Sequence, residues 1–188
     1  MRCAKKQSQI KGLPLRVMFQ DEARFGRMSD PKHCWAPPGV RPQVGYQLSR
    51  EFTYAYGAVS PSDGVSDFLI LPYMTAEVMN LFLAEVARRH PQEYIFMLYD
   101  GAPCHRATAL TIPENMMVKT LPPYCPELNP TEHIWDEIRE KFFPNLVFEN
   151  LAAVENKLVE AVLYLENNPG IVQSITGFQW ILKILAKS

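Results

Sequence analysis

Residues 94–100 read YIFMLYD, an apolar run that ends on a carboxylate. An apolar run without polar alternation is typical of a strand that is buried on both faces of a sheet covered by helices. Helical spacing of apolar residues precedes the run, from an N-cap at Thr75 to His90, and a second apolar run follows at residues 116–121. The middle of the chain therefore predicts strands separated by helices.

The first part of the chain predicts strands without helices between them. Residues 15–20 form a strand that ends at Asp21, and residues 52–59 and 66–71 form a hairpin that turns at residues 61–64 (PSDG). Residues 26–50, rich in Gly, Pro and charged residues, predict a long loop. Later helices are expected at residues 104–110, 129–143, 150–166 and in the second half of the apolar tail 171–185. This order predicts an α/β fold with a mixed five-stranded sheet flanked by helices, as in the ribonuclease H-like fold.

Composition sets the class of protein. The 188 residues suffice for one ordinary domain, and 47% hydrophobic residues suffice for a core. We expect residues 1–13, which are polar and basic, to be a linker remnant and residues 14–188 to be the domain. A net charge of −1 excludes a globally basic nucleic-acid binder but not a local basic groove. Without a membrane span, a secretion signal or a C-x-x-C pair, we expect a cytoplasmic protein whose four cysteines are reduced.

Three carboxylates stand where chemistry requires them. Asp21 and Asp100 follow two strands that should be central neighbours, and Glu132 lies in the first turn of a helix that follows a proline-rich loop. Carboxylates that converge repel one another and so need a cation. Oxygen ligands suit Mg²⁺ or Mn²⁺, and a pair of such ions can activate the attacking oxygen and stabilise the leaving oxygen of a phosphodiester.

Each carboxylate also has a purely structural interpretation. Asp100 with Gly101 is a common turn pair, Asp21 with Glu22 can be solvated charge, and Asn129 with Glu132 has the spacing of a capping box. Glu22 and Asp136 are alternative ligands beside the three. The remaining side chains near these segments also have structural interpretations: His105 contacts a phosphate or packs on the sheet edge, His133 has a structural role, and Trp135 belongs to a core-packing stripe with Ile138 and Phe142.

Five short segments resemble one known family. They are 19–26 (FQDEARFG), 35–39 (WAPPG), 100–105 (DGAPCH), 121–135 (LPPYCPELNPTEHIW) and 174–178 (SITGF). They are similar to the conserved blocks of DDE transposases, in the bacterial mariner-like insertion-sequence branch called the IS-six-thirty family. Together they cover nearly the whole chain. Gly101 departs from the family, which carries Asn after the second aspartate.

The resemblance implies an activity, a site and partners. Asp21, Asp100 and Glu132 would hold two Mg²⁺ or Mn²⁺ ions, cleave DNA at transposon ends and transfer the freed strand to target DNA. DNA and a second copy of the chain are the expected partners, in the bacterial cytoplasm at the nucleoid, with no membrane and no small-molecule substrate. Family members begin with a helix-turn-helix region, which we expect this chain to lack. Two alternatives stay open: a catalytically idle remnant that binds DNA or dimerises as a regulator, and a ribonuclease H-like nuclease outside transposition.

Overall fold

The fold is built around a parallel pair of strands, β1 and β4, at the centre of the sheet. The computed structural model describes residues 1–28, 33, 35–41, 43, 45, 49–101, 110–123 and 125–186. Its strands are β1 (Leu15–Gly26), β2 (Phe52–Val59), β3 (Ser66–Leu71), β4 (Tyr94–Tyr99) and β5 (Met116–Thr120). They lie in the order β3-β2-β1-β4-β5, antiparallel from β3 to β1 and parallel from β1 to β5. This is the mixed five-stranded sheet that the sequence predicts.

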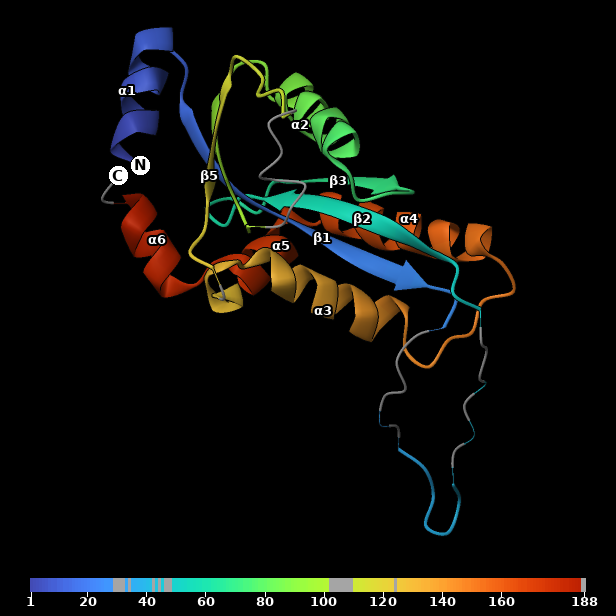
Figure 1. Ribbon diagram of the computed structural model, residues 1–188. Coiled ribbons are helices and arrows are strands. Elements are labelled where there is room, and N and C mark those ends of the chain that lie inside the picture. Colours follow the sequence, from blue (N-terminus) through green and yellow to red (C-terminus); the bar gives the residue numbers. More distant parts are fainter. Residues whose placement is uncertain are drawn as a thin grey trace.

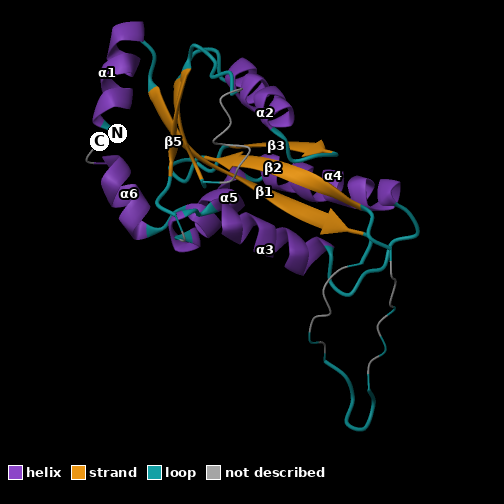
Figure 2. Ribbon diagram, viewed as in Figure 1, coloured by secondary structure: helices purple, strands orange, loops and turns teal. Residues whose placement is uncertain are grey.

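Helices cover both faces of this sheet (Figures 1 and 2). They are α1 (Arg2–Lys11), α2 (Ala76–Arg89), α3 (Thr131–Phe142), α4 (Leu151–Glu166), α5 (Pro169–Thr176) and α6 (Gln179–Ala186). Side chains alternate along β4 between the two layers: Ile95 and Met97 join the core beneath α2, and Phe96 joins the core that α3 and α4 share with α1, α5 and α6. Burial on both sides explains why residues 94–99 carry almost no polar side chain.

β1 is longer than the sequence predicts. The strand does not end at Asp21 but continues to Gly26, because β2 pairs with it from Asp21 to Gly26. Its parallel pairing with β4 stops earlier, at Phe19 opposite Leu98. Polar residues in this stretch suggested a strand end, whereas in the structure they belong to a strand that still pairs with β2 after its pairing with β4 has stopped.

The two ends of the chain are more helical than predicted. A helix, α1, occupies most of the segment expected to be a linker remnant; Ala4 and Ser8, one turn apart, are buried, and Gly12 ends the helix in a left-handed conformation with φ of 65°. The apolar tail forms two helices, which contribute Val172 and Ile181 to the core.

Two of the remaining helices start at the N-caps that the sequence predicts, and one predicted helix lies almost entirely outside the described residues. Thr75 and Asn150 cap α2 and α4, each accepting a hydrogen bond from a backbone N–H with its side chain. The helix predicted at residues 104–110 lies outside the described residues except for Leu110. Within the described ranges, no helix has both the length and the apolar character needed to cross a bilayer.

Trp135 is the largest side chain that α3 inserts against the sheet. Its indole is 1% exposed and makes edge-on contacts with Phe25 and Phe68, at ring-centroid distances of 6.4 Å and 6.1 Å. The predicted core role of Trp135 is thereby confirmed. Gly57 of β2 makes room for it: a methyl group there would lie 2.7 Å from Cη2 of Trp135 and 2.8 Å from Cε1 of Phe68.

Gly57→Ala is therefore expected to lower the free energy of unfolding by about 1–3 kcal/mol, the usual cost of overpacking a dense core. Urea denaturation measures this change. Gly170→Ala is the matched control, because a methyl group on Gly170 meets no atom within 4 Å and lies in a helix, where Ala is preferred. Equal stability of Gly57→Ala and the unsubstituted protein would contradict tight packing of Trp135 on β2.

Candidate active site

Asp21 lies just beyond the point where the pairing of β1 with its neighbour β4 stops. The last paired residue of β1 on that side is Phe19, and Asp21 is two positions further along, still paired with Gly57 of β2 on the other side. Its side chain is on the same face as Trp135, whose Nε1 donates a hydrogen bond of 2.8 Å to Oδ2 of Asp21. Asp21 is buried, with 6% of the residue exposed.

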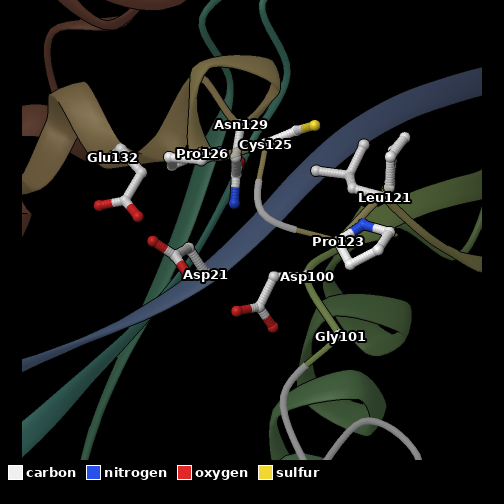
Figure 3. Close-up of a pocket in the computed structure, with 10 residues that line it drawn as sticks. Asp21, Asp100, Gly101, Leu121, Pro123, Cys125, Pro126, Asn129 and Glu132 are labelled. Atoms are coloured by element: carbon white, nitrogen blue, oxygen red, sulfur yellow. The ribbon is translucent and has the colours of Figure 1, made fainter.

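Asp100 and Glu132 reach the same place from different elements. Asp100 directly follows β4, and Glu132 is the second residue of α3; both are exposed. The three carboxylates line one pocket of about 390 Å³, together with Gly101, Asn129 and the proline-rich segment before α3. Figure 3 shows the carboxylates of Asp21 and Glu132 turned toward each other, with Asp100 on the other side of Asp21. The structure thus brings together all three acids that the sequence singles out.

The pocket disfavours negative charge. Burial raises the pKa of Asp21 to about 8, and the nearby charges of Glu132, Glu22 and Asp100 act in the same direction. The hydrogen bond from Trp135 opposes the rise. Partial burial also raises the pKa of Glu132, against the charges of Arg139 and His133, which lower it.

A divalent cation fits this donor set by charge and by ligand type. A cation would relieve the repulsion that raises the pKa of Asp21, and carboxylate oxygens are the ligands that Mg²⁺ and Mn²⁺ prefer. The three carboxylates do not converge on one point in this structure. No three His, Cys, Asp or Glu side chains in the described ranges are grouped so that they could hold a metal ion. Exposure of Asp100 and Glu132 leaves their side chains room to turn inward.

The other residues considered from the sequence take different places. Of the described acids, Glu22 and Asp136 do not line the pocket. His133 packs edge-on against Phe178, at 5.1 Å between ring centroids, in agreement with a structural role. Cys125 lines the pocket as a free thiol, and Cys3 is free and exposed; Cys34, Cys104 and His105 lie outside the described residues.

The hydrogen bond from Trp135 to Asp21 is the feature of the site that sequence reasoning missed. The spacing of the residues could have indicated that Trp135 lies near the acidic site. Glu132 and Trp135 are three residues apart, so they lie on neighbouring positions of one helical turn. An aromatic residue in an apolar stripe nevertheless predicts packing first, and the direction of its N–H depends on the strand against which the helix packs.

Sequence comparison places most of the chain in one family. The sequence model described as DDE superfamily endonuclease matches residues 16–155, a range that includes all three acids. A protein of Sinorhizobium fredii (strain NBRC 101917 / NGR234), described as uncharacterized protein y4pE/y4sA, is 32% identical over 130 residues. Those residues make up 69% of this chain and 96% of the relative.

Solved structures share the fold at low sequence identity. A pre-cleavage Mos1 transpososome has a TM-score of 0.59 at 16% identity, and a Mos1 transposase paired-end complex with left transposon end has 0.58 at 17%; each comparison covers 94% of this chain and 60% of the Mos1 chain. A simian T-cell lymphotropic virus intasome has a TM-score of 0.50 at 13% identity, over 80% of this chain and 48% of that one. These likenesses identify the ribonuclease H-like fold, and the chain spans about 60% of the length of the Mos1 chains.

The raised pKa of Asp21 predicts a pH-dependent stability. Asp21 stays protonated in the folded protein up to about pH 8 but ionises near 3.8 in the unfolded chain. Its neutral form therefore stabilises the fold fully below the unfolded pKa, and this stabilisation is lost as the pH rises through the folded pKa. In EDTA, raising the pH from about 5 to about 7 should lower the free energy of unfolding by about 2 kcal/mol more in the unsubstituted protein than in Asp21→Asn.

Urea denaturation at several pH values measures this difference. Asn keeps an oxygen that accepts the hydrogen bond from Trp135, so Asp21→Asn removes the titration with little change of shape. Parallel pH profiles for the two proteins would show that Asp21 is not buried as a neutral acid.

Proposed function

Because the chain belongs to the DDE superfamily endonucleases, we propose that it cleaves DNA phosphodiester bonds with Asp21, Asp100 and Glu132 and a divalent cation, Mg²⁺ or Mn²⁺. One observation carries the proposal: three acids from three elements, far apart in the sequence, line one pocket at the end of the central strands. Residues 14–188 are the proposed catalytic domain.

The three acids differ in what they can contribute. Asp21 is buried and held by Trp135, so it gives the site a fixed oxygen ligand. Asp100 and Glu132 are exposed at the mouth of the pocket, where they can adjust to a cation and to a phosphate. When bound, divalent cations supply Lewis-acid activation of the attacking oxygen and stabilise the leaving oxygen. Because the pKa of Asp21 is raised, a bound cation would favour its ionised form.

We further propose that the DNA is a transposon end and that strand transfer to target DNA follows cleavage. The similarity of five sequence segments to the IS-six-thirty family supports this assignment, and so does the shared fold with a protein described as Mos1 transposase in complex with a transposon end. DNA is then the partner, and a homodimer would hold two ends together.

Asp100→Asn should abolish metal-dependent nicking of supercoiled plasmid. The loss should be at least about a hundredfold, because a direct ligand matters more than groups that only orient ligands, for which tenfold to hundredfold losses are usual. Asp100 is the acid to replace because it is exposed and its loss leaves the core intact. The assay compares Mg²⁺, Mn²⁺ and EDTA.

Asp136→Asn is the control for this experiment. Asp136 is an exposed acid on the same helix as Glu132 and does not line the pocket, so nicking should continue. Nicking that survives in Asp100→Asn, or in EDTA, would contradict the proposed site. Folded protein without any nicking would leave two explanations, a catalytically idle remnant that binds DNA or dimerises, and a catalytic domain that needs a DNA-binding domain; fusion to such a domain decides between them.

A further inference from the structure

Three buried side chains at the start of α3 donate hydrogen bonds to three consecutive residues of β1. Oγ1 of Thr131 donates to the carbonyl oxygen of Phe19 at 2.9 Å. Nδ2 of Asn129 donates to the carbonyl oxygen of Gln20 at 3.1 Å, and Figure 3 shows this amide turned toward β1. Nε1 of Trp135 completes the set with its bond to Asp21. All three donor residues are at most 4% exposed.

The side chain of Asn129 bonds to both the helix and the strand. Asn129 and Glu132 have the spacing of a capping box, but Pro130 is the N-cap of α3, and Oδ1 of Asn129 accepts a hydrogen bond of 3.3 Å from the backbone N–H of Thr131. Nδ2 of the same side chain donates to β1. Asn129 therefore ties the first residue of α3 to the strand.

The position of Glu132 depends on the helix that carries it. No hydrogen bond from the described residues holds its carboxylate, which is exposed at the mouth of the pocket. Thr131 and Trp135 are four residues apart, one before and one after Glu132, and both point at β1. Together they fix the turn on which Glu132 sits.

We propose that Asn129, Thr131 and Trp135 are positioning residues that hold the first turn of α3 on β1 and thereby set the place of Glu132 relative to Asp21. This inference rests on the proposed function, in which Asp21 and Glu132 share one cation. It adds that cation binding requires the three positioning residues as well as the three acids. The affinity of the pocket for the cation should fall when the turn loosens, even if every carboxylate remains.

Thr131→Val tests the inference, with Thr176→Val as its matched control. Both threonines are completely buried, and each Oγ1 donates to a backbone carbonyl oxygen, Phe19 at 2.9 Å for Thr131 and Val172 at 2.7 Å for Thr176. Valine keeps the shape and removes the donor. Urea denaturation measures the stability that each variant loses, so an effect on residues 131–135 beyond that expected from lost stability comes from the place of Thr131 beside Glu132.

Two measurements on the full chain separate positioning from stability. Hydrogen–deuterium exchange in EDTA reports on the amides of residues 131–135, and Mn²⁺ titration followed by electron paramagnetic resonance reports on cation affinity. In Thr131→Val, exchange in this segment should be faster than in the unsubstituted protein. Half-saturation should need at least about tenfold more Mn²⁺, the usual effect of losing a group that orients a ligand. Thr131→Ser, which keeps the hydroxyl, should restore both values.

Asn129→Ala is the second variant, for the case in which Thr131→Val does not fold. Its control is Asn115→Ala, because Nδ2 of Asn115 donates to the carbonyl oxygens of Ala87, His90 and Glu93, at 3.3, 3.0 and 3.3 Å. Asn115 lies before β5, away from the pocket lining. Only Asn129→Ala should loosen residues 131–135 and weaken Mn²⁺ binding.

The outcomes distinguish this inference from the proposed function. If each variant and its control change exchange and Mn²⁺ affinity equally, the three residues only stabilise the fold and the inference is overturned. If the unsubstituted protein binds no Mn²⁺ but exchange rises only in the variants at 129 and 131, the positioning of Glu132 stands and the proposed metal-dependent function fails.

Discussion

The structure depends on one difference in length between two paired strands. β1 continues to Gly26, whereas its pairing with β4 stops at Phe19. Where this pairing stops, side chains at the start of α3 donate hydrogen bonds to the carbonyl oxygens of Phe19 and Gln20, buried groups that would be costly to leave without partners. Asp100 and the pocket lie where β4 stops. Fold and site therefore have the same origin.

Much of this arrangement could be predicted from the sequence. The apolar run at residues 94–99 indicated a central strand, and the change of apolar spacing after Thr75 indicated α2. Two of the acids followed predicted strands and the third lay in the first turn of a predicted helix. These features are local, since a periodicity or a cap depends on neighbours in the chain. The nearness of Asp21 and Asp100 was predicted from the rule that neighbouring parallel strands run toward the same edge, although β1 continues beyond Asp21.

The features that could not be predicted depend on contacts between distant segments. The extension of β1 beyond Asp21 needs β2, which is separated from it by a long loop. The helix α1 is stabilised by burial of Ala4 and Ser8, although its composition is mostly polar. The N–H of Trp135 and the amide of Asn129 could point in several directions until the strand beneath them was known. Tertiary contact decided each case.

The proline-rich segment before α3 is stiff, and this stiffness restricts how its length can change. Pro122, Pro123 and Pro126 line the pocket, and Pro130 begins the helix with φ of −65°. A proline ring holds φ near this value, so such a segment cannot absorb an added residue by bending. Over evolutionary time, the number of residues from Leu121 to Glu132 should therefore stay constant, because an inserted residue would move Glu132 away from the other acids of the pocket.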